Sequence, residues 1–215
     1  MSFLRARSEE EIVSRQDEIL AAGETLFQRS GYNGVNFKAI SDLATFTRPT
    51  IYNYYKNKDE VLLALLQREL VSWKAEFTAK IAAVDCMTGE DYCRYLTQSV
   101  KPHPNLFRLL AFLFSSMEDN CRLENLRDFY GVVQEAFVCI DTSVDRFFPL
   151  ASQRSRRDFR FQVVALCLGL HTMTSLSDKQ TAALREIGAI DEIPAFSELF
   201  SQGVLTLLTA MERKC

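Results

Sequence analysis

Polar and aromatic side chains surround a few apolar ones between residues 48 and 54, in a segment with the composition of a short helix. An arginine there could form paired hydrogen bonds with a guanine edge, and an asparagine with an adenine edge, in the major groove of DNA. On a helix, Ile51 and Tyr55 would share the buried side because they are four residues apart. The side chains left facing outward are Arg48, Thr50, Asn53 and Tyr54. The residue types therefore favour a helix that reads bases from its first turns.

A second short helix, predicted over residues 37–44, must hold this one in place. Residues 45–47 between the two helices are few enough to form the turn of a helix-turn-helix. Pro49 fits the first turn of the second helix, where backbone amides have no helical partner. The residues predicted to bury the first helix and to fill the turn are Ile40, Leu43, Ala44 and Phe46. Helices this short are unstable alone in water, so we expect both to pack on longer neighbours.

Longer helices are predicted on either side of this pair. A capping box of Ser8 and Glu11 marks the start of the first helix, and Gly31 marks its end. Asn57 is predicted to cap the helix that follows the pair, which has the apolar spacing to continue for about six turns. The free amides of that helix start, together with the Lys58 ammonium, would bind a phosphate.

The charge distribution agrees with this picture. Residues 36–58 hold four basic side chains against one acidic side chain, a charge of +3, so the remaining chain carries −6 within a total of −3. This total argues against a protein that is basic throughout, and the separation fits one surface that meets phosphate.

The composition of the whole chain predicts an all-α protein. Helical periodicity is nearly continuous and no β-branched run alternates, with breaks at glycines and prolines that divide residues 83–215 into about six further helices. The six cysteines lack metal-ligand spacing and are expected to be reduced. The longest apolar run, residues 163–170, is far shorter than the roughly 20 residues that cross a bilayer. No signal peptide is apparent, so we expect a cytoplasmic protein without a membrane partner.

The segment RPTIYNYYKNKDEVLLALL resembles the end of the DNA-binding domain in the TetR family of bacterial regulators, and the similarity extends over residues 12–66. The resemblance implies a three-helix helix-turn-helix domain over residues 1–57, followed by a larger helical effector-binding and dimerisation domain over residues 58–215. It implies a homodimer that binds a palindromic operator and an unidentified small-molecule effector. The DNA-contacting residues that it implies are Asn36, Lys38, Thr47, Arg48, Thr50, Tyr52, Asn53, Tyr54 and Lys58. Of these, Tyr52 and Lys58 would hold phosphates.

The sequence departs from the family pattern at two positions. Thr45 stands where the family often has glycine in the turn, and Ser41 replaces a common alanine where the two helices approach closely. Thr45 fits only if the backbone there avoids the left-handed conformation.

The effector site is predicted from composition alone. The candidate pocket residues are His103, Phe112, Met117, Phe137 and His171. Two late helices carry apolar stripes that could pair across a two-fold axis as a four-helix interface. The stripes are Phe159, Val163, Leu166 and Leu170 on one helix, and Phe196, Leu199, Phe200, Leu207 and Leu208 on the other.

Structural roles compete with the functional ones. Tyr52, Tyr54 and Tyr55 could simply pack, and Lys56 and Lys58 could be a solvated helix start. His103 and His171 could be ordinary core or surface histidines, and the arginine run 154–160 could be a solvated or interface surface. Signatures of enzymes, cofactors and metal sites are missing, so no catalysis is expected. The sequence therefore predicts a DNA-binding regulator, a repressor released from DNA by its effector. A ligand-binding helical dimer without DNA function and a helical enzyme remain the alternatives.

Overall fold

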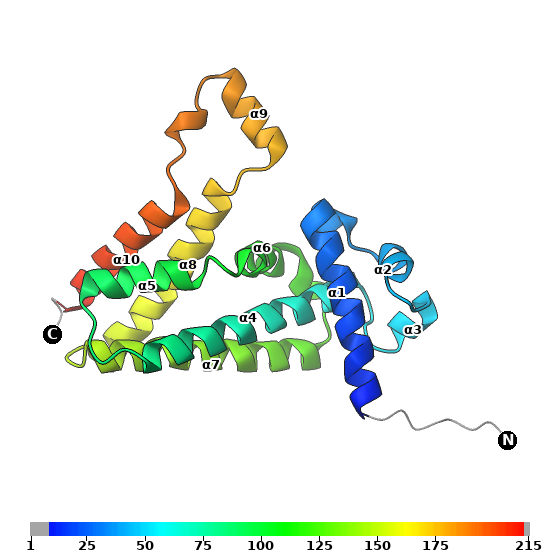
Figure 1. Ribbon diagram of the computed structural model, residues 1–215, viewed down its shortest axis with the longest axis horizontal. Coiled ribbons are helices and arrows are strands. Elements are labelled where there is room, and N and C mark those ends of the chain that lie inside the picture. Colours follow the sequence, from blue (N-terminus) through cyan, green and yellow to red (C-terminus); the bar gives the residue numbers. More distant parts are fainter. Residues whose placement is uncertain (1–8, 213–215) are drawn as a thin grey trace. The chain divides into compact units, whose positions relative to one another are not determined.

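The computed structural model describes residues 9–212, which form ten α-helices and no strand (Figure 1). This confirms the all-α prediction. Ser8, half of the predicted capping box, and Cys215 lie outside the described residues, and the five cysteines inside them are free thiols. The chain divides into two compact units, of which the first contains residues 9–68 and 112–129 and the second contains residues 69–111 and 130–212.

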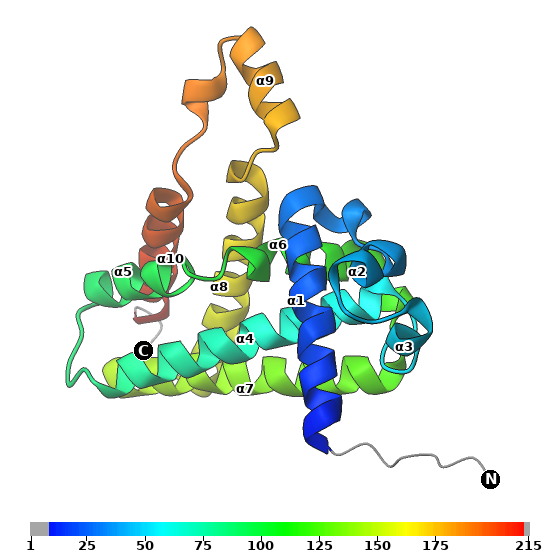
Figure 2. The ribbon, with the colours of Figure 1, turned by 45° about the vertical axis from the view of Figure 1, so that its right-hand side comes forward.

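The first unit is built on α1 (Glu9–Gly34), with α2 (Phe37–Leu43) beside it and α3 (Arg48–Tyr52) beside α2 (Figure 2). Residues 58–68 of α4 (Lys58–Ala82) complete this helical group. The side chains fully buried at its centre include Ile19, Phe27, Ile40, Ile51 and Leu62. One apolar side chain from each short helix therefore anchors that helix to the long ones.

The helix boundaries largely follow the sequence signals. The regular part of α1 ends at Gly31, whose φ of 65° lies in the left-handed region that glycine adopts most readily. The short helices occupy nearly the predicted ranges, although α3 ends at Tyr52 instead of Tyr54. The prediction for Leu43 was wrong: its side chain is 48% exposed, because this helix buries only Ile40 fully.

A second chain segment also belongs to the first unit. It begins at Phe112, the last residue of α6 (Pro104–Phe112), and continues through the π-turn η1 (Leu113–Met117) and the 3-10 turn η2 (Glu118–Asn120). The segment ends within the first turns of α7 (Leu123–Phe147).

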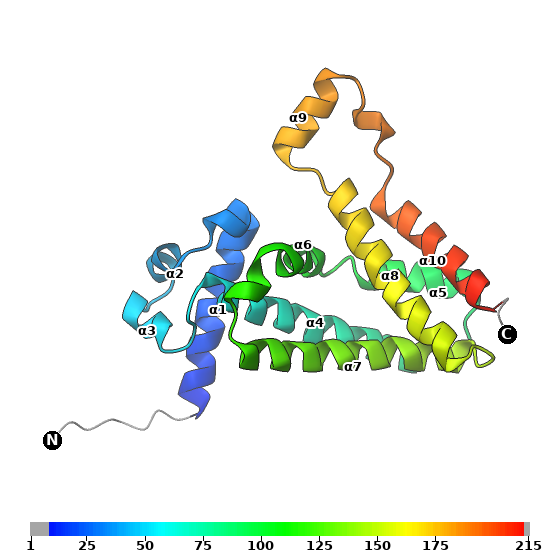
Figure 3. The ribbon, with the colours of Figure 1, turned by 180° about the vertical axis from the view of Figure 1, so that it is seen from behind.

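The second unit contains the remaining parts of α4, α6 and α7 together with α5 (Gly89–Ser99), α8 (Gln153–Thr174) and α10 (Phe196–Glu212). In this unit α4 lies beside α7, and α10 packs on both α8 and α5 (Figure 3). The large side chains buried there include Phe77, Tyr92, Phe159 and Phe200.

The connection from α8 to α10 runs through α9 (Asp178–Glu186) and the 3-10 turn η3 (Ile190–Glu192). Helix α9 buries none of its residues. Among the described helices, none has by itself the length and apolar composition to cross a bilayer. Helices α8 and α9 together reach that length and composition, but they are bent by 64° relative to each other.

The apolar stripes expected at a dimer interface are used inside the protomer. Phe159 and Val163 of α8 are 1% and 3% exposed, and Phe200 and Leu208 of α10 are each 1% exposed. These side chains fill the core of the second unit, so they are not available to a second copy. For these four residues the prediction of an interface was wrong, because a helical apolar stripe does not reveal what it packs against. The other predicted residues of the two stripes are half-buried, and their place at an interface stays a prediction: Leu166, Leu170, Phe196, Leu199 and Leu207.

Truncation of Phe27 should destabilise the protein strongly. Its ring is fully buried in α1 and lies edge-on to Phe112 at a centroid distance of 6.3 Å. Phe27→Ala should lower the free energy of unfolding by about 3 to 5 kcal/mol in urea titrations. The matched variant Val13→Ala, on the same helix at a side chain 55% exposed, should change it by no more than about 0.5 kcal/mol. Equal losses in the two variants would contradict the packing described for the first unit.

Candidate nucleic-acid interface

The helix-turn-helix is held by short, local hydrogen bonds. The Asn36 side chain accepts from the Ala39 amide at 2.9 Å and so caps α2. Thr47 occupies the N-cap position of α3, and its hydroxyl lies 3.2 Å from that of Thr50. Two of the predicted site residues therefore occupy the N-cap positions of the short helices, and only Asn36 makes a side-chain capping hydrogen bond.

The turn between α2 and α3 accommodates Thr45 without strain. No described residue other than glycine has a positive φ. The Thr45 amide and hydroxyl both donate to the Glu18 carboxylate on α1, at 2.7 and 2.6 Å, and these hydrogen bonds lower the pKa of Glu18. Ser41, the other departure, donates its hydroxyl to the Lys38 carbonyl. Thr45 therefore ties the turn to α1 through two hydrogen bonds, of which glycine could form only the one from the amide.

Two of the four side chains predicted to face outward from residues 48–54 are exposed. Arg48 and Asn53 are exposed, while Thr50 and Tyr54 are half-buried. Ile51 is fully buried and Tyr55 is 6% exposed, which confirms their predicted packing role. Helix α3 is thus supported on its inner side, and its first turn faces outward.

The Tyr52 side chain is exposed, and the Phe37 ring supports it. Its side chain is 62% exposed, and its ring meets that of Phe37 edge-on at 4.8 Å. A pocket of about 400 Å³ lies at this end of α3. Its lining residues are Tyr52, Asn53, Tyr54, Tyr55, Lys56 and Arg122.

The start of α4 is capped as predicted, by Asn57, whose side-chain oxygen accepts from the Asp59 and Glu60 amides. The prediction that free amides here would bind a phosphate was wrong for these two amides, because the cap already occupies them. Lys58 has partners that the sequence did not reveal. Its ammonium lies 3.7 Å from the Tyr32 ring centroid and donates to the Tyr32 carbonyl at 3.2 Å. The Tyr32 hydroxyl in turn donates to Asp59 at 2.7 Å. The Lys58 side chain is therefore held at the helix start instead of moving freely in solvent.

Glu60 is the most heavily bonded carboxylate of this region. Its side chain has no exposed surface, and the Arg122 guanidinium donates to both its oxygens, at 2.7 and 2.9 Å. The Lys56 and Arg122 amides also donate to it, at 2.7 and 3.2 Å. Burial alone would raise the pKa of Glu60, but these hydrogen bonds outweigh burial and bring the pKa below its usual value. The carboxylate therefore stays charged and links the loop before α4 to the start of α7.

The candidate effector residues are divided between the two units. In the first unit, Phe112 stacks on Tyr32 at 4.6 Å, and Met117 is fully buried. In the second unit, Phe137 packs against Phe161. The two histidines also lie in the second unit.

Each histidine has surroundings of its own. His103 is buried, with its two ring nitrogens 3.4 and 3.5 Å from the carboxylates of Glu69 and Glu76 on α4. The ring of His171 lies near those of Phe107 and Phe196. Burial, helped by the charge of Arg108, lowers the pKa of His171.

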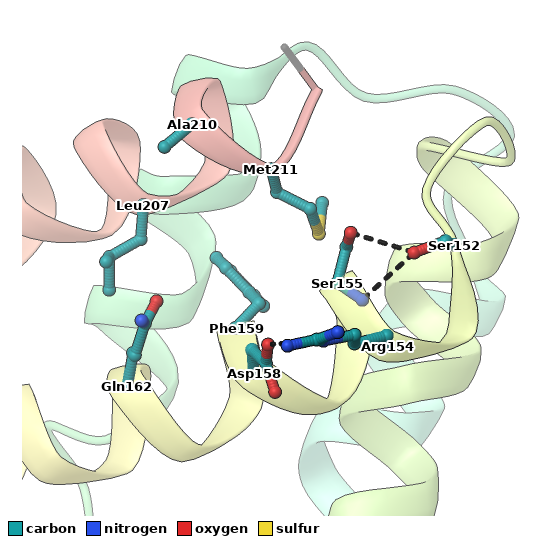
Figure 4. A pocket seen from close by; sticks show the side chains of 9 residues that line it. All are labelled: Ser152, Arg154, Ser155, Asp158, Phe159, Gln162, Leu207, Ala210 and Met211. Carbon is teal, nitrogen blue, oxygen red and sulfur yellow. Dashed lines mark hydrogen bonds and ion pairs between the residues drawn. The ribbon is translucent and has the colours of Figure 1, made fainter. Parts of the chain in front are cut away.

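The four arginines of the run on α8 pair with three aspartates within the protomer. Arg156 pairs with Asp145, Arg160 with Asp141, and both Arg154 and Arg157 with Asp158. A pocket of about 370 Å³ lies beside this run, between the start of α8 and the end of α10 (Figure 4). The predicted effector residues do not line this pocket. The ion pairs favour the interpretation of this run as a structural surface over a second nucleic-acid site.

Comparison with known proteins gives a consistent family. Residues 19–65 match the family described as "Bacterial regulatory proteins, tetR family", and residues 67–214 match "Tetracyclin repressor-like, C-terminal domain". No protein with a curated description matches the chain.

Several solved structures share the fold. One is the fatty acid degradation regulator FadR from Bacillus halodurans, at 17% identity over 90% of this chain and 94% of that one, with a TM-score of 0.59. Another is SmeT, the repressor of the Stenotrophomonas maltophilia multidrug efflux pump SmeDEF, at 18% identity over 91% of this chain and 89% of that one, with a TM-score of 0.56. A third is FadR from Bacillus subtilis in complex with stearoyl-CoA, at 17% identity over 89% of this chain and 96% of that one, also with a TM-score of 0.56. At these identities the similarity shows the fold alone.

Acid should weaken the first unit through Glu60. Because its pKa in the folded protein lies below the ordinary value of 4.5, its contribution to stability is complete above 4.5 and is lost as the pH falls through the folded-state pKa. Glu60→Gln should flatten the acid side of the curve of unfolding free energy against pH, measured by urea titration. Glu124→Gln, which removes an exposed partner of the same guanidinium, is the matched control. The same acid slope in wild type and Glu60→Gln would rule out this role.

Proposed function

Because the chain belongs to the TetR family of bacterial regulatory proteins, we propose that it is a repressor that a small-molecule effector releases from a palindromic operator. The observation that carries this proposal is the supported, outward-facing first turn of α3. Ile51 and Tyr55 hold the helix from within, and Arg48 and Asn53 are exposed with the chemistry that reads guanine and adenine edges.

The remaining predicted contacts follow from their positions on the same surface. Residues 47–54 would line the groove, with Thr47, Arg48, Thr50, Asn53 and Tyr54 as its contacts. Asn36 and Lys38, at the start of α2, would touch the backbone or a groove edge. Tyr52 and Lys58 would hold phosphates. The contact between the Lys58 ammonium and Tyr32 favours this role, because it holds the charge in place before DNA arrives.

A homodimer would present two copies of α3 about 34 to 36 Å apart, one turn of DNA, and so would require a palindromic site. We place the interface on the outer surface of α8 and α10. Ala165 and Gly169 are exposed there, and no atom lies within 4 Å of a Cβ added at Gly169. Helix α9, which buries none of its residues, extends from the same pair of helices.

The effector would bind within the second unit. Phe137, His103 and His171 are its proposed contacts there. Phe112 and Met117 belong to the first unit, so their role as effector contacts stays a prediction outside this site. B. subtilis FadR holds stearoyl-CoA, so an effector with an apolar body is the class to test first. Helix α4 contributes residues to both units, and a shift of this helix would transmit binding. The coupling can be no larger than the difference in effector affinity between the two states.

Selection of bound duplexes from a random pool tests the DNA-binding function directly. Wild-type protein should recover an inverted repeat, with affinity that falls steeply as salt rises. A protein that recovers no sequence and binds DNA without salt dependence would instead be a ligand-binding dimer without DNA function. Steady turnover of a substrate would indicate the enzyme alternative.

Arg48 and Lys58 should differ in how their loss affects binding. Arg48→Ala should weaken binding to the recovered repeat by about 1 to 3 kcal/mol and relax sequence preference. Lys58→Ala should weaken binding to all duplexes and reduce the salt slope by about 1. Fluorescence anisotropy across a salt series measures both effects. Equal losses on every sequence for both variants would remove the base-reading role from Arg48.

Gly169→Arg should separate the protomers. The fold should accept the arginine because no atom lies within 4 Å of an added Cβ, whereas a second copy packed on this surface would not. Light scattering after size exclusion should give twice the chain mass for wild type and the single-chain mass for the variant. Gly131→Arg on α7, an equally open position, should leave the dimer intact. A dimer that survives Gly169→Arg would move the interface elsewhere.

A further inference from the structure

We propose that Arg122, acting through Glu60, is a positioning residue for base recognition: it fixes the angle at which α3 is presented to DNA. This inference rests on the proposed function, because it assigns a residue outside the helix-turn-helix to the same DNA-reading surface. Arg122 lies 62 residues beyond Glu60 in the sequence, and it precedes α7.

The C-terminal end of α3 depends on the loop over residues 53–57. Helix α3 spans only residues 48–52, so the loop that follows decides how the helix is oriented. The Lys56 amide in this loop donates to the Glu60 carboxylate at 2.7 Å. The Arg122 guanidinium donates to both oxygens of that carboxylate and reaches the Tyr54 carbonyl at 3.5 Å. Glu60 and Arg122 therefore hold the backbone directly behind the exposed part of α3.

A second hydrogen bond fixes the same loop to the same segment. The Asn57 side chain donates to the Asn120 carbonyl at 2.8 Å while its oxygen caps α4. Two consecutive anchors, one neutral and one ionic, thus join the loop to residues 120–122. We call these residues the anchor corner.

The anchor corner is itself fixed to the core of the first unit. Phe112, earlier in the same segment, stacks on Tyr32 at 4.6 Å and meets Phe27 edge-on. Met117 is fully buried. Because the corner is supported in this way, it can act as a fixed point for the loop instead of moving with it.

The chemistry of the pair suits positioning more than stabilisation. The two-point contact of a guanidinium with a carboxylate constrains direction as well as distance, which a lysine cannot reproduce. A buried carboxylate also pays for its loss of hydration, so such pairs contribute little net stability when both partners are present. The charged pair of Glu60 and Arg122 is therefore better explained by the direction it imposes on the loop than by added stability.

The test compares selective and non-selective DNA binding in the full-length protein. The probes are the duplex that wild-type protein recovers from a random pool and a scrambled duplex of the same length and composition. Arg122→Gln should weaken binding to the recovered duplex by about tenfold to a hundredfold, the loss expected when a base contact is misplaced. Binding to the scrambled duplex should stay as in wild type, because the phosphate-binding cations remain. Arg122→Lys should give an intermediate loss.

Two further variants separate positioning from folding. Glu124→Gln removes the other carboxylate that contacts the guanidinium, at 3.1 Å and 60% exposed, and should leave both affinities unchanged. If Arg122→Gln fails to fold, the double variant Glu60→Gln with Arg122→Gln removes both charges and leaves neither unpaired. Circular dichroism confirms the folded state, and the double variant should still lose selectivity.

The outcomes are distinguishable. Folded variants that bind the recovered duplex as tightly as wild type would overturn the positioning role, as would an equal loss on both duplexes. If wild-type protein recovers no sequence at all, the proposed function fails, and the role of Arg122 fails with it.

Discussion

The charge on Glu60 is the constraint on which the DNA-facing surface depends. A carboxylate with no exposed surface must be satisfied by hydrogen bonds, and here it receives them from the Arg122 side chain and from the Lys56 and Arg122 amides. These donors come from two segments far apart in the sequence. The requirement to satisfy one buried charge therefore brings the loop behind α3 and the anchor corner together.

Short helices make this constraint necessary. Helix α2 has seven residues and α3 has five, and neither length is stable without packing. Each helix buries one residue fully, Ile40 in α2 and Ile51 in α3. One buried side chain fixes which side of the helix faces inward but lets the helix tilt about that contact, so the Glu18 bonds to Thr45 and the bonds behind Tyr54 are needed to define its direction.

Local signals in the sequence predicted local structure well. The capping role of Asn57, the end of the regular part of α1 at Gly31 and the burial of Tyr55 all depend on residues within one or two turns of each other. The partners of Lys58 and Glu60 could not be predicted, because Tyr32 and Arg122 are 26 and 62 residues away. Helical periodicity likewise identified the apolar stripes of α8 and α10 but not their neighbours. The assignment of residues 1–57 as a domain stays a prediction, and the compact unit around α3 also holds residues 58–68 and 112–129.

Charge placement explains why the same chain can be acidic overall and still approach DNA. The arginines of α8 are each paired with aspartates of α7 or α8, so they add little field beyond their own surface. Lys38, Arg48 and Lys56 are exposed beside α2 and α3, and Lys58 is held at the adjacent helix start. Arg122 is the exception near this surface, since two carboxylates neutralise it. A cation that pairs with an internal carboxylate contributes orientation instead of attraction. Under the proposed function, the exposed basic residues would attract DNA, and Arg122 would hold α3 at a fixed angle to it.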